Sequence, residues 1–144
     1  MLLPDVNVCL YAMRSDSPHH QPCKTWLESA INDSEPVGVS ELVLSSVLRI
    51  STNHRVFREP SRVEDVLEFC DTLMAAPAVT RVRPGARHWG IFTSLVRKHN
   101  ARANDVPDTY LAALGLENGA TFVTRDGDFA RFEGLRRLDP ISAD

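Results

Sequence analysis

The sequence contains no stretch of about 18 consecutive apolar residues, the length that a membrane-spanning helix needs. It does not start with a basic stretch followed by an apolar core, so we expect neither a membrane span nor a secretory signal peptide. Low-complexity tracts and internal repeats are absent as well. With 43% hydrophobic and 24% charged residues, the composition is that of a folded globular protein. We expect a single domain over residues 1–144.

Cysteine is scarce and irregularly placed. The three cysteines are Cys9, Cys23 and Cys70, and none of them belongs to a C-x-x-C pair. An odd number of cysteines without this spacing argues against a disulfide framework and against a zinc ribbon. We therefore expect reduced thiols and a cytoplasmic protein.

An excess of positive charge is also missing, because the formal net charge is -3. The molecule as a whole is not expected to attract nucleic acid, so any such contact must be local. The basic residues that lie close together in sequence are Arg49, His54, Arg55 and Arg58, followed later by Arg97, Lys98, Arg102 and Arg125. Taken singly, such residues are more often part of solvated helix faces.

Short apolar runs alternate with longer segments of helical periodicity. Strands are expected at residues 2–6, 37–40, 79–82, 120–124 and 135–138. Helices are expected at 7–13, 18–31 and 106–116, after Ser40 and Ser61 as N-caps, and after Pro84-Gly85, with a short helical turn at 129–132. Strands separated by such helices imply right-handed crossovers. The pattern predicts an α/β fold of three layers, with a central, mostly parallel sheet of four or five strands between helices.

Acidic residues follow several of these strands or begin the next helix: Asp5, Glu41, Asp108, Asp126 and Asp128. Because parallel strands end on a common edge of the sheet, we expect these side chains to approach one another there. Unpaired acids repel one another unless a cation lies between them. Hard divalent ions such as Mg²⁺ prefer oxygen ligands. The arrangement therefore predicts a metal site.

Asp108 has the clearest geometric argument. It lies in the first turn of a helix and shares a face with Leu111 and Ala112, so it points inward. A buried lone carboxylate is costly unless it is paired or metal-bound, and the helix dipole favours its ionised form. Asp105 is predicted to be an N-cap instead.

Each of the other acids has a simpler explanation. Asp5 fits an N-cap, and Glu41 fits the first turn of a helix, where a negative charge complements the dipole. Asp126-Gly127-Asp128 fits a surface turn. Phe129, with Phe132, is expected to hold that turn against the sheet.

Three segments carry a resemblance to a known family: Pro4-Asp5-Val6-Asn7-Val8, Pro107-Asp108-Thr109-Tyr110-Leu111-Ala112-Ala113 and Thr124-Arg125-Asp126-Gly127-Asp128-Phe129. In their order and spacing they resemble the PIN-domain ribonucleases, more narrowly the VapC-type toxins of bacterial toxin–antitoxin pairs. The last segment matches the family's T-x-D-x-D-F ending and is the most specific. One position departs from the pattern, because many relatives carry an acid near Ser46-Val47-Leu48-Arg49, where this chain has none. Glu41 is the expected substitute.

The resemblance implies a PIN-like fold and a metal-dependent endoribonuclease. Asp5, Asp108 and Asp126 would hold one or two Mg²⁺ ions, for which Mn²⁺ can substitute, and Glu41 and Asp128 would complete the catalytic set. Asn7 and Thr124 would orient these ligands. Arg49, Arg55 and Arg102 are the expected phosphate contacts. The five histidines show no acid–base pair of the kind that a metal-independent ribonuclease needs.

The resemblance also implies partners. The substrate would be structured RNA, either tRNA or ribosomal RNA, cut where the bases are single-stranded. A VapB-type antitoxin would place a basic residue on the acidic groove, and the toxin would form a homodimer.

Two alternatives remain open at this point. A haloacid-dehalogenase-type phosphatase needs a second aspartate at the position of Asn7, and a PIN-like module that binds RNA or a partner without cutting is favoured by the uncertain role of Glu41.

Overall fold

The computed structural model of the protein describes residues 1–142, so the last two residues of the predicted domain lie outside the described range. The strands are β1 (Leu2–Pro4), β2 (Val37–Val39), β3 (Val79–Arg81), β4 (Thr121–Val123) and β5 (Arg136–Leu138). The helices are α1 (Val6–Met13), α2 (His20–Ile31), α3 (Glu41–Ser51), α4 (Val63–Ala75), α5 (His88–His99) and α6 (Asp105–Asn118), with a 3₁₀ helix η1 (Gly127–Arg131). Within residues 1–142, no helix has both the length and the apolar character to cross a membrane.

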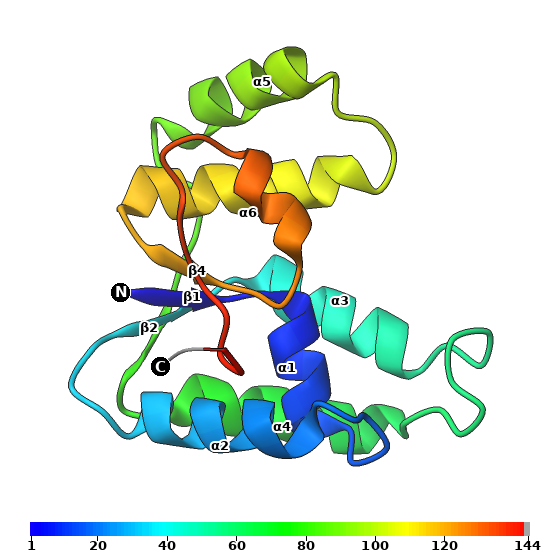
Figure 1. The fold of residues 1–144 in the computed structure, drawn as a ribbon. Coiled ribbons are helices and arrows are strands. Elements are labelled where there is room, and N and C mark those ends of the chain that lie inside the picture. The colour runs from blue at the N-terminus through cyan, green and yellow to red at the C-terminus, as the bar shows by residue number, and fades with distance from the viewer. Residues whose placement is uncertain (143–144) are drawn as a thin grey trace.

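The strands form one sheet in the order β3-β2-β1-β4-β5, and every neighbouring pair is parallel. Figure 1 shows α5 and α6 on one side of this sheet and α2 and α4 on the other. The predicted three-layer α/β/α fold is confirmed, including β5 as an edge strand. Since all strands run in the same direction, the segments that follow β1, β2 and β4 leave from one edge of the sheet.

The core explains why such short strands are stable. Leu3, Val37 and Phe122 are fully buried in the three central strands, as expected for a parallel sheet covered on both faces. Gly38 allows β2 to pack closely against the side chains of Val82 and Met1. A Cβ atom at Gly38 would lie 2.6 Å from Cγ2 of Val82 and 2.8 Å from Sδ of Met1. A side chain at this position would collide with the side chains of Val82 and Met1 and force them to shift.

Two of the predicted helix boundaries are confirmed in detail. Ser40 is the N-cap of α3, and its hydroxyl accepts a hydrogen bond from the backbone N of Leu42. Gly119 ends α6 with φ at 58°, the left-handed conformation that glycine adopts without strain.

Two predicted caps are wrong. Arg62, not Ser61, precedes the first residue of α4, because the Ser61 hydroxyl accepts a hydrogen bond from Nη1 of the buried Arg14 at 2.8 Å. Asp105 is the first residue of α6 rather than its N-cap, and Asn104 stands in the N-cap position. Arg14, which is distant in sequence, thus binds the Ser61 hydroxyl that the local pattern assigned to the start of α4.

Candidate active site

A cavity of about 400 Å³ lies at the carboxyl edge of the sheet. Asp5 from the end of β1, Asp108 from the first turn of α6 and Asp126 from the turn after β4 all line it. An apolar groove between α2 and α4 is lined by only one carboxylate, that of Glu28. The three acids predicted as metal ligands are therefore brought to one cavity, which is the candidate active site.

Asp5 is held by three hydrogen bonds. Its Oδ1 accepts from the backbone N of Val6 at 2.7 Å, and its Oδ2 accepts from the Thr124 hydroxyl at 2.7 Å and from Nδ2 of Asn7 at 3.2 Å. The side chain is only 4% exposed, and this burial raises the pKa of Asp5 to about 6. The bonds from Thr124 and Val6 oppose the rise, while the charges of Asp108 and Asp126 add to it. Asp5 thus sits in a field that favours a bound proton or a cation.

Asp126 is oriented by its own turn. Its Oδ1 accepts a hydrogen bond from the backbone N of Asp128 at 2.9 Å, and its backbone N donates to the Thr124 hydroxyl at 3.0 Å. Phe129 and Phe132 are 0% and 2% exposed, so they anchor the turn against the core as predicted. The turn therefore holds the carboxylate through Oδ1, and Thr124 holds the backbone of the same residue.

Asp108 is half-buried and lines the cavity together with Leu111 of the same helix. Burial raises the pKa of its carboxyl group, and the nearby charge of Asp126 raises it further. Arg131 lowers this pKa, whereas Asp105 and Asp128 contribute smaller increases. The carboxylates of three segments therefore act on one another electrostatically.

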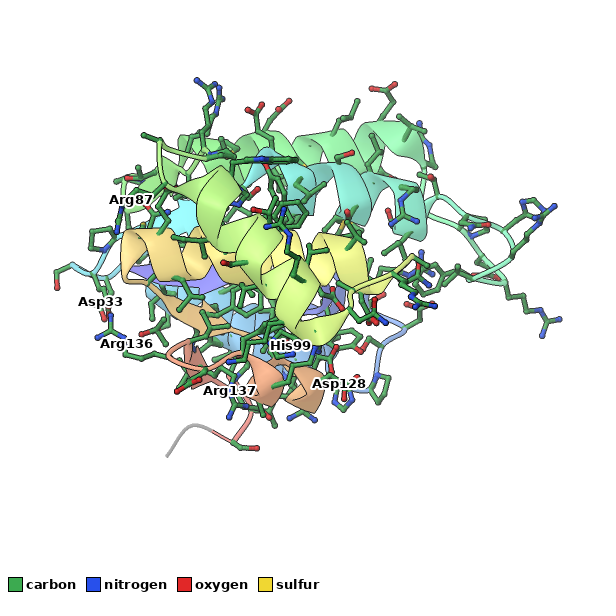
Figure 2. The ribbon with its side chains drawn as sticks, turned by 90° about the horizontal axis from the view of Figure 1, so that it is seen from above. Asp33, Arg87, His99, Asp128, Arg136 and Arg137 are labelled. Atoms are coloured by element: carbon green, nitrogen blue, oxygen red, sulfur yellow. The ribbon has the colours of Figure 1, made fainter. Side chains whose placement is uncertain are left out.

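Asp128 lies at the surface rather than in the cavity lining. Figure 2 shows it at the outer side of the molecule, beside the turn of η1. Its backbone holds Asp126, and its charge reaches Asp108. The geometry supports an accessory contribution from Asp128.

The structure does not bring Glu41 to the cavity. The side chain is 61% exposed and pairs with Arg83 at 3.5 Å. The cavity is instead lined by Leu42, Ser46, Arg49 and Ile50 of α3, whose spacing places them on one face of the helix. Glu41 is one residue out of phase with that face, so the role predicted for it has no support from this geometry.

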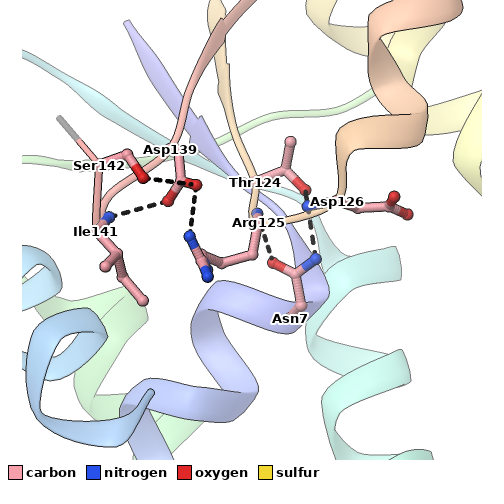
Figure 3. Close-up of polar contacts among 7 residues, drawn as sticks. All are labelled: Asn7, Thr124, Arg125, Asp126, Asp139, Ile141 and Ser142. Carbon is pink, nitrogen blue, oxygen red and sulfur yellow. Dashed lines mark hydrogen bonds and ion pairs between the residues drawn. The ribbon is translucent and has the colours of Figure 1, made fainter. Parts of the chain in front are cut away.

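Asn7 and Thr124 connect Asp5 to the segment that carries Asp126. Nδ2 of Asn7 donates to Asp5 and, at 3.3 Å, to the Thr124 hydroxyl, while Oδ1 of Asn7 accepts from the backbone N of Arg125 at 3.3 Å. Figure 3 shows this bridge between α1 and the segment after β4. Two segments that are far apart in sequence are thereby held in register around Asp5.

The predicted phosphate contacts occupy different places. Arg49 lines the cavity, whereas Arg55 and Arg102 are exposed residues of the loops before α4 and α6 and lie outside the lining. Sequence reasoning missed Arg131, whose Nη2 lies 3.8 Å from Oδ1 of Asp105 and which acts on Asp108. It also missed Asp139, which pairs with Arg125. No spacing rule marks either residue, because both contacts depend on the folded chain.

The donor set suits a hard divalent ion, although the side chains are not closed around one. Within residues 1–142, no three His, Cys, Asp or Glu side chains form a group that could hold a metal ion as arranged. Mg²⁺ does not require such a cage, since it usually keeps several waters and takes one or two carboxylates together with substrate phosphates. The clustered carboxylates, with the raised pKa of Asp5, fit such an ion.

Comparisons with known proteins identify the family of this chain. The family model of the PIN domain matches residues 2–135. The chain is 45% identical to ribonuclease VapC43 of Mycobacterium tuberculosis over 141 residues, which cover 98% of this chain and 96% of the relative. It is 36% identical to ribonuclease VapC25 of the same organism, over 97% of this chain and 99% of the relative.

Solved structures show the same fold at lower identity. A VapBC2 complex from Rickettsia felis, bound to a promoter DNA fragment, matches with a TM-score of 0.67 at 18% identity, over 95% of this chain and 96% of that chain. Mycobacterium tuberculosis VapC20, described as a sarcin–ricin loop cleaving toxin, matches with a TM-score of 0.65 at 17% identity, over 94% and 99%. A phosphatase of the haloacid dehalogenase type is therefore the wrong alternative. The chain belongs to the PIN-domain family and, within it, to the VapC ribonucleases.

Proposed function

We propose that this protein is a divalent-metal-dependent endoribonuclease and the toxin of a toxin–antitoxin pair. One observation carries the proposal: Asp5, Asp108 and Asp126, from three separate segments, line a single cavity at the carboxyl edge of the sheet. The relatives at 45% and 36% identity are named VapC ribonucleases, which supports the same reaction class.

Asp5, Asp108 and Asp126 would hold Mg²⁺, with Mn²⁺ as a substitute, and Asp128 would add negative charge from the rim. When bound, such an ion supplies positive charge that activates water and offsets the charge developing on the phosphate. Asn7 and Thr124 keep Asp5 in place through hydrogen bonds of 3.2 and 2.7 Å. The N-terminal end of α6 opposes the rise in the pKa of Asp108 that burial and Asp126 cause, and so favours the ionised form, which is the form that binds a metal.

The substrate would be structured RNA, tRNA or ribosomal RNA, cut within a single-stranded loop. Arg49 is the candidate phosphate contact in the cavity, because it shares the lining with the three acids. Arg55 and Arg102 are exposed and would contact the backbone farther from the scissile bond. The net charge of -3 makes such local contacts necessary.

The partner would be a VapB-type antitoxin, and solved relatives are VapBC complexes. A guanidinium from the antitoxin would pair with the carboxylates of the cavity and so exclude substrate and metal. We further propose a cytoplasmic homodimer. The outer face of α4, where Val63 and Leu67 are 49% and 40% exposed, offers apolar surface for it.

The experiment is cleavage of total RNA by the purified protein with Mg²⁺ and with EDTA. We expect cleavage only with metal, and a loss of at least about a hundredfold in Asp5→Asn and Asp108→Asn, because removing a metal ligand removes most of the catalysis. Asp33→Asn is the matched control, since Asp33 is exposed and Figure 2 shows it on the opposite side of the molecule from Asp128. Cleavage that persists in EDTA or in both site variants contradicts the proposal.

A module that binds RNA without cutting it is the second candidate. The observation that favours it is the position of Glu41, which leaves Ser46 on the cavity face of α3 and no acid there. RNA binding by the wild-type protein without cleavage under Mg²⁺ or Mn²⁺ would select this alternative.

A further inference from the structure

We propose that Asp139 is a positioning residue, which holds the guanidinium of Arg125 away from the acidic cavity and so keeps the carboxylates free for a cation. The inference rests on the metal site of the proposed nuclease. It concerns a residue outside the PIN match, which ends at residue 135.

The two side chains form a close and partly shielded ion pair. Nη1 of Arg125 lies 2.5 Å from Oδ2 of Asp139, and the side chains are 24% and 33% exposed. Asp139 is itself fixed by the turn that follows β5. Its Oδ1 accepts from the backbone N of Ile141 at 3.0 Å, and its Oδ2 accepts from the Ser142 hydroxyl at 3.3 Å. The acceptor is therefore pre-positioned before the arginine binds it.

Arg125 would otherwise be a natural partner for the acids of the cavity. It directly precedes Asp126 in sequence, and its backbone N is hydrogen-bonded to Asn7, which also binds Asp5. A guanidinium forms strong charge-assisted pairs with carboxylates. Released from Asp139, this side chain would be free to turn towards the carboxylate of the adjoining Asp126.

The backbone keeps the two charges apart. Asp126 is extended, with φ at -88° and ψ at 110°, whereas Arg125 lies at a bend of the backbone. Figure 3 shows the Arg125 side chain directed towards Asp139 and the Asp126 side chain directed the other way. Asp139 secures the outward direction with an opposite charge.

The test is a double-mutant cycle with Mn²⁺ binding to the whole protein, measured calorimetrically without RNA. Asp139→Asn keeps the shape and the hydrogen-bond acceptor but removes the charge, so we expect Mn²⁺ affinity and kcat to fall about tenfold or more, with KM nearly unchanged. Arg125→Gln in the same protein removes the competing guanidinium. We expect the double variant to return to within about threefold of the wild-type affinity.

Glu133→Gln is the matched control, because it breaks the Lys98–Glu133 ion pair of 3.1 Å on the surface. It should leave Mn²⁺ affinity unchanged. A merely structural role for Asp139 predicts that the double variant binds Mn²⁺ as weakly as Asp139→Asn or more weakly. That result, or an Asp139→Asn variant that binds as tightly as Glu133→Gln, overturns the proposal.

Failure of the nuclease function would be visible separately, as a wild-type protein that neither binds Mn²⁺ nor cuts RNA. The positioning role is then tested in EDTA by NMR, from the chemical shift of the side-chain carboxyl carbon of Asp126. We expect it to shift in Asp139→Asn, to return in the double variant, and to stay in place in Glu133→Gln. An unchanged Asp126 resonance in Asp139→Asn overturns the proposal independently of metal and activity.

Discussion

The Thr124 hydroxyl donates a hydrogen bond of 2.7 Å to Oδ2 of Asp5, a residue 119 positions earlier in the chain. The same oxygen accepts from the backbone N of Asp126 at 3.0 Å and from Nδ2 of Asn7 at 3.3 Å. A hydroxyl has one donor and two acceptor positions, and Thr124 uses all of them. One side chain thus fixes the position of Asp5 relative to Asp126.

Replacing Thr124 by Val should damage the site, because it removes the donor to Asp5 and the acceptor for Asp126 without changing the volume. We expect a loss of about 1–3 kcal/mol in the free energy of unfolding. Metal affinity should fall about 10- to 100-fold, as for other groups that orient ligands. Denaturant unfolding and calorimetric Mn²⁺ binding measure the two effects.

Thr124→Ser is the control for that variant, since it keeps the hydroxyl. It should restore most of the metal affinity of the wild type. If Val and Ser variants bind Mn²⁺ equally well, the hydroxyl does not organise the acids.

Asp5→Asn should make the metal-free protein more stable near neutral pH while removing its response to metal. The charged form of Asp5 is disfavoured by burial, and the asparagine has no charge to bury. The gain in unfolding free energy should be about 1–3 kcal/mol, reduced because the amide nitrogen of asparagine cannot accept the hydrogen bond of Val6 in one orientation or those of Thr124 and Asn7 in the other. Thermal unfolding with EDTA and with Mg²⁺ measures it.

The informative result is the difference in Tm between the protein with EDTA and the protein with Mg²⁺. Mg²⁺ should raise the Tm of the wild-type protein, because it binds the folded state alone, and should not raise that of Asp5→Asn. An Asp5→Asn protein that Mg²⁺ stabilises as much as the wild type would show that the ion binds elsewhere.

The metal-free protein should gain stability as the solution becomes moderately acidic. The pKa of Asp5 is raised from 3.8 to about 6, so the folded state binds a proton more tightly than the unfolded state. The buried charge of Asp5 destabilises the folded state fully at pH values well above 6, and this destabilisation is relieved as the pH falls through 6. The unfolding free energy in EDTA should therefore rise between about pH 7 and pH 5, by up to about 1.4 kcal/mol per pH unit.

Other carboxylates reverse this trend at lower pH. Hydrogen bonds or ion pairs lower the pKa values of Asp16, Glu117 and Asp139, so their stabilising contributions are lost as those groups become protonated. Denaturant unfolding across this pH range in Asp5→Asn provides the comparison. A wild-type curve that matches the Asp5→Asn curve between pH 7 and 5 would mean that Asp5 does not titrate there.

Arg49→Gln should weaken substrate binding more than the chemical step. Arg49 lines the cavity with the three acids, whereas the exposed Arg137 of β5 lies outside the lining and serves as the control position. We expect KM for RNA to rise about 3- to 30-fold, with a shallower salt dependence because one phosphate contact is lost. Cleavage kinetics at several salt concentrations measure this. A fall in kcat alone would place Arg49 in the chemical step instead.

Local sequence signals located most of the site. Asp5, Asp108 and Asp126 were predicted from the ends of apolar runs and from helical phase, and the parallel sheet then brought them together. Glu41 shows the limit of such reasoning. A position next to a strand end does not determine which side of the following helix a residue faces. Leu42 faces the cavity, whereas Glu41, one residue earlier, pairs with Arg83.

Contacts between distant segments were beyond the reach of sequence patterns. Arg14 binds Asp16, Ser61 and the backbone of Glu59, and its guanidinium lies 3.6 Å from the centre of the Phe57 ring. This cluster takes Ser61 away from its predicted cap. Nothing in the spacing of Arg14 distinguishes it from the exposed arginines of the chain.

The sequence by itself determined the order of strands and helices, the three-layer class and the strand-end positions of the three acids that line the cavity. Periodicity and turn chemistry act over a few residues, and a linear pattern records them. Only the tertiary structure decided that Ser46 and Arg49 face the cavity in place of Glu41 and that Asp139 holds Arg125. These outcomes depend on helix rotation and on packing between remote segments, where distances of a few ångströms determine which charges meet.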